Sequence, residues 1–572
     1  MTTLSVNNVS DASINTLQPV DAVSLAHAEH DRFRDFRDEK FDVIVVGAGI
    51  GGLTSAALLS QRGYSVLVLD MHYALGGCAT VFHRRGKGQG YEFDVGLHYV
   101  GDSGPDGLIP RILRGAGVED ISFLEQDPDG FDTLCFPDFK FRVPRGVEVF
   151  RDRLVEMFPG EVRGIDRYVK LLRQVWGLMS VHANPVSAFR VLPKSLMALK
   201  YANATVKEFL DTCTHDERLR AVLTGQLGVY HQPPSRASLM GHAGVSMHFL
   251  QGSFYPSGGG QTLSDRFADV IERNGNKILL RTKAKRIITR DGKVVGVEFE
   301  NKALGTQVAY APVVISNADL KQTMLQLVGD DQLSKKASHR VRGYEMSPAM
   351  GVVYLGVKRN FREEGMANTN LRLYPSYDFE TVYREVAANR FPAQPHIFVG
   401  NATLKDPDNP ALAPPGVTNM QLMSVVPSSF GAWGVSEEEY KNCSYRKSRV
   451  YHDNKKAFAE SLIHETERVI PGLAKDIVFQ EVSTPITLMR YTAASNGTSY
   501  GMSLVPWQFL YRRPGPCTDV KGLFLCGASL RTGHGIFGAM TSGVEAAAMV
   551  VGRRLVGEVL GARRDSCGSG SV

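Results

Sequence analysis

Cysteine is scarce in this 572-residue chain, and its seven copies are widely scattered without a Cys-x-x-Cys pair. This spacing argues against a disulfide framework and a zinc site, so we expect no metal and a reducing compartment. The chain also lacks any run of about 18 uninterrupted apolar residues, so no transmembrane helix is predicted. Its start has no apolar core flanked by basic residues, and no secretory signal is expected.

An excess of charge of one sign is also missing. The 65 Lys and Arg against 59 Asp and Glu leave a net charge of +6, too small to indicate a nucleic-acid partner. We find no Ser-His-Asp arrangement, no His-Glu-x-x-His and no phosphate-binding Gly-x-x-x-x-Gly-Lys loop, so hydrolase and kinase chemistry lose support. A hydrophobic content of 43% and the chain length favour a globular protein of two closely joined domains, expected in the cytoplasm.

The first part of the chain carries a nucleotide-binding pattern. Residues 41–46 predict a buried parallel strand, GAGIGG (47–52) predicts a tight turn, and residues 50–62 predict a helix. The three glycines of Gly-x-Gly-x-x-Gly allow the turn, the approach of a pyrophosphate and close packing of helix on strand. A second strand over 65–70 ends in Asp70, placed to accept hydrogen bonds from ribose hydroxyls.

The last part of the chain looks like the other half of the same site. GLFLCGAS (522–529) predicts a short strand and a turn, and GHGIFGAMTSGVEAAA (533–548) predicts the start of a helix made of small residues. Between the ends, Asp291-Gly292 predicts a hairpin between strands over 277–288 and 293–298. Strand-like runs recur at 347–357, 396–402 and 419–426, and a helix is predicted at 453–470.

These motifs carry a family resemblance. Asp70, the pair Gly76-Gly77 and FDVGLHYVG (93–101) resemble a large flavoprotein group that includes phytoene desaturases, carotenoid isomerases, retinol saturases and amine oxidases. GGCATVF and FDVGLHYVG resemble retinol saturases, while CGAS and GHGIFGAM resemble phytoene desaturases and carotenoid isomerases. The resemblance spans residues 41 to about 555 and implies FAD rather than NAD as the cofactor. It also implies a strand at 313–319 that leads back to the substrate domain. Ala528 stands where many members have Asp, which points to the branch that acts on carotenoids.

The resemblance implies an α/β fold in which a Rossmann-like FAD-binding domain of the glutathione-reductase type is interleaved with a substrate domain of mixed sheet and helices. The expected segments are an N-terminal extension (1–40), FAD-binding parts (41–150, 251–335, 486–560), a helical lid segment (151–250), a substrate-domain sheet with helices (336–485) and a flexible tail (561–572). The residues implied to bind FAD are Gly47, Gly49, Gly51, Gly52, Asp70, Gly76, Gly77, Ala284, Gly527, Ala528, Gly535, Ile536 and Gly538.

Residues 171–207 carry five cations, no acid and many interleaved apolar side chains. Such a stretch fits peripheral contact with an anionic membrane, and it equally fits a helical lid over an apolar cavity. Candidate catalytic groups are weak. They are His98 after the Asp-x-Gly turn and His534 at the start of the last helix, while Tyr230 and His231 are placed where they would line a chamber.

The function predicted from these features is an FAD-dependent oxidoreductase acting on carbon–carbon bonds of a long lipophilic polyene, a carotenoid or retinoid. Desaturation, saturation and cis–trans isomerisation stay open, because flavin supplies the redox step and an apolar tunnel serves all three. The alternatives are action on an unsaturated fatty acyl chain and a flavin-binding lipid carrier without turnover. Amine oxidation is disfavoured because no aromatic cage pair is evident. Oligomeric state is not predicted.

Overall fold

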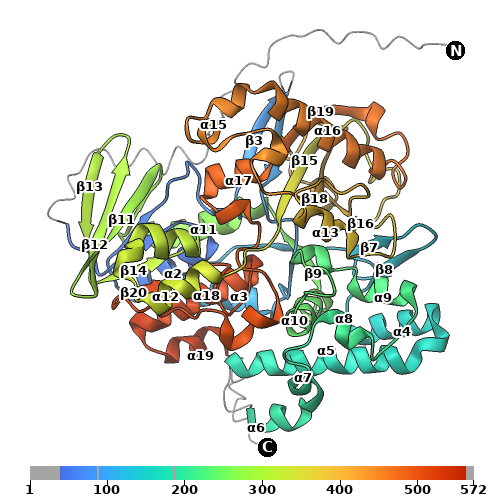
Figure 1. Ribbon diagram of the computed structural model, residues 1–572, viewed down its shortest axis with the longest axis horizontal. Helices are drawn as coiled ribbons and strands as arrows, with labels where there is room; N and C mark the ends of the chain where they lie inside the picture. Colours follow the sequence, from blue (N-terminus) through green and yellow to red (C-terminus); the bar gives the residue numbers. More distant parts are fainter. Residues whose placement is uncertain (1–38, 87–88, 184–187, 562–572) are drawn as a thin grey trace, which may run out of the picture.

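The computed structural model describes residues 39–86, 89–183 and 188–561 (Figure 1). The predictions for the extension (1–40) and the tail (561–572) therefore fall almost wholly outside the described residues. Residues 39 and 40 are not helical, and Lys40 forms a bridge with Tyr310.

A five-stranded parallel sheet gathers strands from distant parts of the chain. Its order is β10 (Lys277–Leu279), β2 (Val66–Leu69), β1 (Val43–Val46), β14 (Val313–Ser316) and β20 (Leu523–Leu525). All four side chains of β1 are buried, as expected for a strand covered on both faces. Three helices belong to the same domain as this sheet: α2 (Ile50–Ser60), α11 (Gly259–Arg273) and α18 (Gly535–Val551). Helix α2 contacts both α11 and α18. The α/β fold with a Rossmann-like sheet is thus confirmed.

A second, mixed sheet of seven strands forms the other large layer. Its order is β19 (Ile477–Ser483), β15 (Ala349–Val357), β18 (Thr418–Val426), β17 (Ile397–Asn401), β16 (Asn370–Leu373), β7 (Asp132–Cys135) and β8 (Lys140–Val143). Neighbours are antiparallel except β16 and β7. The strands predicted at 347–357, 396–402 and 419–426 are confirmed as β15, β17 and β18. Strands β7 and β8 join this sheet although they fall inside the segment 41–150.

The predicted hairpin is confirmed, but its first strand is two strands. β11 (Thr282–Arg290) and β12 (Lys293–Asn301) pair through Asp291 and Gly292, whose φ values are +52° and +71°, and β13 (Gly305–Tyr310) completes a three-stranded sheet. The expectation of one strand over 277–288 is wrong. The chain turns at Arg281, with φ +53°, so β10 joins the parallel sheet and only β11 enters the hairpin.

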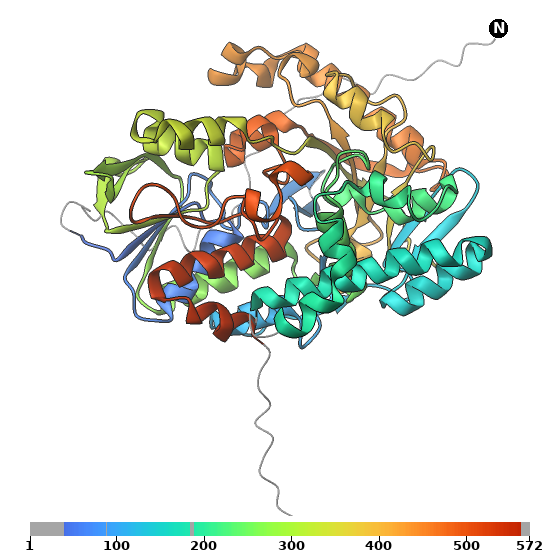
Figure 2. The same ribbon diagram turned by 60° about the horizontal axis from the view of Figure 1, so that its bottom comes forward.

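A group of helices packs at the β7–β8 end of the seven-stranded sheet and runs along the lower edge of the molecule in Figure 1; Figure 2 shows the same group from another side. They are α4 (Val147–Met157), α5 (Val162–Ala183), α6 (Ala188–Val191), α7 (Leu196–Lys200), α8 (Val206–Leu210), α9 (Glu217–Thr224) and α10 (Leu239–Leu250). The predicted helical character of 151–250 is confirmed. Within the described ranges, no helix combines the length and apolar character needed to cross a bilayer.

The remaining elements connect these layers. The helix predicted at 453–470 is α16 (Arg449–Thr466), which contacts β18 and β19 near the top of Figure 1, and α17 (Pro485–Thr492) contacts β15 and β19. The other regular elements are β3 (Val81–Gly86), β4 (Gln89–Asp94), β5 (Val100–Gly101), β6 (Phe123–Glu125), β9 (Ser253–Pro256), α3 (Leu108–Gly115), α12 (Lys335–Gly343), α13 (Thr381–Ala387), α14 (Ala402–Lys405), α15 (Glu437–Lys441) and α19 (Arg554–Leu560).

Candidate functional site

One cavity of about 1180 Å³ joins the carboxyl end of the parallel sheet to the inner face of the seven-stranded sheet. Both chain ends contribute to its wall, although they are separated by more than four hundred residues of sequence. The implied cofactor residues that line it are Gly47, Gly49, Gly51, Asp70, Gly76, Gly77, Ala284, Gly527, Ala528, Gly535 and Ile536. Gly52 and Gly538 do not line it, and both sit where a side chain would collide with nearby backbone.

In the turn after β1, each glycine is required for a different steric reason. Gly47 has φ +97°, a conformation that favours glycine. A Cβ added at Gly52 would run into the carbonyl oxygen of Gly47, so this glycine serves helix-on-strand packing. A Cβ at Gly49 would meet only the Asn317 amide, 2.5 Å away, and would otherwise project into the cavity. The backbone at Gly49 is therefore open to a ligand.

Asp70 is fixed at the end of β2 by the neighbouring turns. Its Oδ2 accepts a hydrogen bond from the Ala48 backbone N–H at 2.6 Å, and its Oδ1 accepts one from the His72 N–H at 2.7 Å. Burial raises the pKa of this carboxyl, while the two backbone donors oppose the rise. A carboxylate has further lone pairs, and this one faces the cavity, so it is able to accept hydrogen bonds from a ligand.

The double glycine closes against the first turn. Gly76 donates its N–H to the Ala48 carbonyl at 2.8 Å, and the pair has φ values of +102° and +60°. A Cβ at Gly77 would approach the Gly49 Cα at 3.2 Å. Cys78 follows directly, faces the cavity, and has its thiol pKa raised by burial.

The second half of the site meets the first through a residue that the sequence reasoning did not single out. Asn317 follows β14, and its side chain lies between the turns at Gly51 and Gly527, where added Cβ atoms would come within 2.7 and 3.1 Å of its Oδ1. The Cys526 thiol donates to the same oxygen at 3.5 Å. Gly527 has φ +104° and donates its N–H to Ser542 Oγ at 2.7 Å, which joins the turn to α18.

The start of α18 points at the cavity. Gly535, Ile536 and Ala539 in its first turns line the wall, and no side chain caps its free N–H groups. Such a helix end favours negative charge. His534 itself lies behind this wall: its Nε2 is 3.1 Å from the Val229 carbonyl, and its ring packs 4.7 Å from that of Tyr500. Burial lowers the pKa of His534 to about 3, so its ring is neutral at pH 7.

His98 does face the chamber, and its Nε2 is buried without a hydrogen-bond partner among the described residues. Burial, followed by the charge of Lys405, lowers its pKa to about 3. Lys405 donates its Nζ proton to the His98 carbonyl at 2.6 Å and thereby holds the loop after β4. A neutral imidazole with an open nitrogen is able to hydrogen-bond a ligand without bringing a charge.

The wall of the inner chamber is mostly apolar, with a few polar groups. Val352, Tyr354, Phe398 and Met423 contribute apolar wall from the seven-stranded sheet, together with Met350. Arg372 on β16 also lines the chamber, and it forms a buried ion pair with Asp132 on β7 at 2.8 Å. This pair carried no local signal in the sequence, because its members are 240 residues apart.

Two other sequence-based expectations do not match the wall. Tyr230 and His231 do not line the cavity; Tyr230 donates to or accepts from His242 Nδ1 at 2.7 Å inside the helical layer. No described residue between 171 and 207 lines the cavity either, so the interpretation of this stretch as a lid over the cavity is wrong. Its helices pack along the outer edge of the molecule, away from the seven-stranded sheet's inner face (Figure 1).

Comparison with known proteins agrees with this geometry. Residues 45–115 match the family model "NAD(P)-binding Rossmann-like domain". The chain is 28% identical to an all-trans-retinol 13,14-reductase of Danio rerio over 90% of this chain and 87% of that protein, and 26% identical to the human one over 91% and 87%. It is 28% identical to prolycopene isomerase 1 of an Oncidium hybrid cultivar over 88% and 83%. The chain is thus similar, over about nine-tenths of its length, to all-trans-retinol 13,14-reductases and prolycopene isomerases.

Solved structures share the fold of this chain. An oxidoreductase from Methanosarcina mazei aligns with a TM-score of 0.59 at 17% identity, covering 89% of this chain and 99% of that one. A putrescine oxidase structure aligns with a TM-score of 0.56 at 16% identity, covering 90% and 99%. At this identity the likeness shows the fold alone, an interleaved Rossmann-like and substrate-domain architecture.

Proposed function

We propose that the protein is an FAD-dependent oxidoreductase that acts on carbon–carbon single or double bonds of a long lipophilic polyene. The observation that carries this proposal is the continuous cavity, which has a nucleotide-type turn at one end and an apolar chamber at the other. Similarity to retinol reductases and prolycopene isomerases along about nine-tenths of the chain supports the same class of substrate. A carotenoid or retinoid is therefore the substrate proposed for this chain.

The residues present fit FAD. Gly49 leaves the backbone open, Asp70 offers a fixed carboxylate, and the free end of α18 favours the electron-rich edge of a reduced ring. When bound, the flavin supplies hydride or electron transfer. The other implied positions that line the cavity, including Ala284 on β11 and Ala528 after β20, are proposed as further contacts, whereas Gly52 and Gly538 serve packing.

The protein itself positions the substrate and excludes water from it. The chamber wall is mostly apolar, and His98 is uncharged at neutral pH because of burial. We assign no general acid or base, since both candidate histidines have pKa values lowered to about 3. His98 stays a candidate for orienting the substrate, and His534 supports the wall from behind.

The mass of the product distinguishes the possible reaction types. Incubation of the FAD-loaded protein with a polyene should change its mass by two hydrogens for desaturation or saturation and leave it unchanged for isomerisation. A fatty acyl substrate is the second candidate, since an elongated apolar chamber serves both. An inactive all-trans-retinol 13,14-reductase of Danio rerio, 26% identical to this chain, keeps the carrier without turnover as a defined alternative.

The decisive experiment is therefore anaerobic photoreduction of the purified, FAD-loaded protein followed by mixing with polyene. An enzyme reoxidises its flavin or changes the polyene spectrum, and a carrier does neither. Protein that stays colourless after addition of FAD contradicts the cofactor itself.

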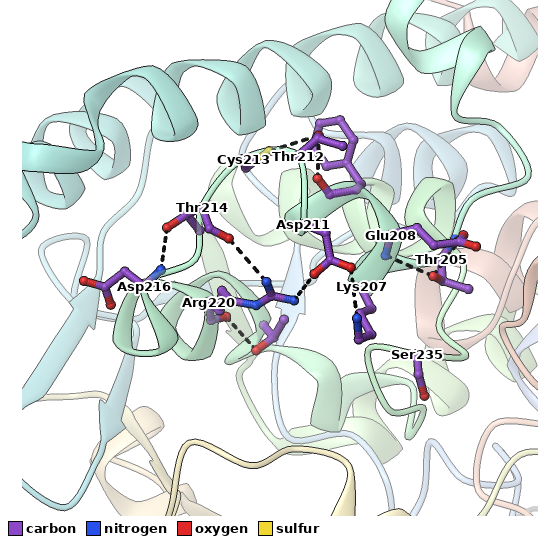
Figure 3. A network of polar contacts seen from close by, with 12 residues as sticks. Thr205, Lys207, Glu208, Asp211, Thr212, Cys213, Thr214, Asp216, Arg220 and Ser235 are labelled. Carbon is purple, nitrogen blue, oxygen red and sulfur yellow. Dashed lines mark hydrogen bonds and ion pairs between the residues drawn. The ribbon is translucent and has the colours of Figure 1, made fainter.

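We also propose peripheral contact with an anionic membrane through the α6–α7 segment. Leu196 is 70% exposed there, beside the half-exposed Leu192 and Leu199, which are unusual positions for large apolar side chains. Two of the five cations predicted to face lipid are paired: Arg173 with Glu148, and Lys207 with Asp211 at 2.9 Å in the network of Figure 3. The other three, which have no ion-pair partner within the described ranges, are Arg190, Lys194 and Lys200.

Vesicle sedimentation tests this contact. Replacing Arg190, Lys194 and Lys200 by Gln should weaken binding to anionic vesicles by about 1 kcal/mol for each charge at low salt. A control with the same loss of charge replaces three exposed cations of α12, namely Lys335, Lys336 and Arg340. Equal binding by both triple variants contradicts the proposed surface.

A further inference from the structure

A buried polar cluster interrupts the apolar wall of the chamber. Arg372 is 3% exposed and Asp132 is 0% exposed, so the pair is desolvated. Arg372 donates its Nε–H to Asp132 Oδ2 at 2.8 Å and an Nη2 hydrogen to the Tyr99 hydroxyl. Tyr99 in turn donates to Asp132 Oδ2 at 3.3 Å, which closes a three-membered ring of hydrogen bonds.

The guanidinium is held rigidly. Its carbon lies 4.9 Å from the ring centroid of Phe398 and 6.0 Å from that of Tyr99, and these two rings stack on each other at 5.8 Å, so the guanidinium packs against an aromatic pair. Asp132 and Arg372 sit on the paired strands β7 and β16, which fixes both backbones. A cluster built this way keeps its direction whether or not a ligand is present.

The cluster has hydrogen-bonding capacity to spare. A guanidinium has five N–H donors. Asp132 and Tyr99 use one each and Tyr374 lies close enough to use another, so at least two are left. Arg372 and Tyr99 both line the cavity, and so does His98, whose Nε2 is buried without a partner among the described residues. Polar groups of this kind are costly when they face only hydrocarbon.

From this arrangement we infer that Arg372, supported by Asp132 and Tyr99, determines substrate specificity by binding an uncharged oxygen on the polyene. The inference rests on the proposed function and narrows its substrate to an alcohol, aldehyde or ketone. The charge of Arg372 is already matched by Asp132. A substrate carboxylate would add an unmatched negative charge beside a buried aspartate, whereas a hydrocarbon end would leave the donors unpaired.

Binding measurements with three polyenes of equal length test the inference: an alcohol, the matching carboxylic acid and the matching hydrocarbon. The FAD-loaded protein should bind the alcohol roughly tenfold more tightly than the hydrocarbon, the value of one hydrogen bond to a charged donor. The acid should bind more weakly than the alcohol. Failure of all three to bind contradicts the proposed function, while equal binding of alcohol and hydrocarbon overturns only the inference.

The variant must remove both charges, because Arg372→Leu alone would leave Asp132 buried and unpaired. The double variant Arg372→Leu/Asp132→Leu should bind alcohol and hydrocarbon equally while its FAD content is unchanged. Arg372→Lys is the second variant, should the double one fail to fold; it keeps the charge, loses the fork of donors and should lose most of the preference.

A matched control removes another ion pair of the same cavity. Arg84 and Glu481 also line it, joined at 2.6 Å and each about one-third exposed. The variant Arg84→Leu/Glu481→Leu should keep the preference for the alcohol. The inference is overturned if the preference for the alcohol is lost in the Arg84→Leu/Glu481→Leu variant but kept in the Arg372→Leu/Asp132→Leu variant. The substrate oxygen would then bind at the Arg84–Glu481 pair.

Discussion

Gly49 offers a sharp test of the nucleotide turn, because the structure separates its role from that of Gly52. An Ala side chain at 49 suits the local backbone, whose φ is −69° and ψ is 166°. Its Cβ would meet only Asn317 Nδ2, at 2.5 Å, and this amide is the end of a flexible side chain. Moving it costs about 1 kcal/mol, the cost of an off-rotamer side chain. The variant should therefore fold.

FAD binding should suffer far more than stability. The new methyl group would stand between the backbone and a pyrophosphate, and each lost hydrogen bond from N–H to phosphate is worth about 1.5–3 kcal/mol. We therefore expect Gly49→Ala to raise the Kd for FAD by roughly ten- to a hundredfold, and Gly49→Val to abolish retention. The assay is flavin fluorescence on titration of the apoprotein, with melting followed in parallel.

Gly52→Ala is the matched control with the opposite signature. Its Cβ would overlap the Gly47 carbonyl oxygen, which is backbone and has no rotamer to change. This variant should melt at a lower temperature, with or without FAD. The reasoning is refuted if Gly49→Ala keeps its FAD affinity, or if the two variants lose stability and affinity in the same proportion.

The remaining predictions concern Cys78, Asp94 and His98. Cys78 faces the cavity, so alkylation mapped by peptide mass should label Cys78 in the apoprotein, and faster at high pH because its pKa is raised. Bound FAD should protect Cys78, while the exposed Cys443 reacts equally in both forms. Labelling of Cys78 that FAD does not affect would contradict the proposed site. Burial raises the pKa of Asp94 from 3.8 to about 6, so the folded state holds its proton more tightly and the free energy of unfolding should fall by about 3 kcal/mol as pH rises from about 4 to about 6. Urea unfolding of Asp94→Asn should lack this fall, and parallel pH profiles would contradict the assignment. His98→Phe should leave FAD binding intact and weaken binding of the alcohol polyene more than that of the hydrocarbon; an equal loss for both would mean that His98 only fills space.

The nucleotide turn was predictable because each of its requirements is local. A buried strand, a glycine with φ +97° and an acid at the end of the next strand all fall within thirty residues. The Arg372–Asp132 pair had no such signal, since its partners meet only after β16 and β7 pair across 240 residues. The same limit explains the cations of residues 171–207. The acids that neutralise Arg173 and Lys207 are Glu148 and Asp211, which lie outside that window.

Asn317 was not predicted as a site residue, although its position after a strand could have indicated it. The run 313–319 was predicted as a strand, and β14 confirms its first four residues. Carboxyl ends of parallel strands meet at one edge, where ligands of such sheets bind. The register pairs Ser316 with Val46, so the next residue of each strand, Asn317 and Gly47, must be neighbours. A polar residue directly after any strand of a parallel sheet is thus a candidate ligand-binding residue because of its position in the sequence alone. Asp70 meets that criterion after β2 and Asn317 meets it after β14, and the two lie on either side of the glycine turn.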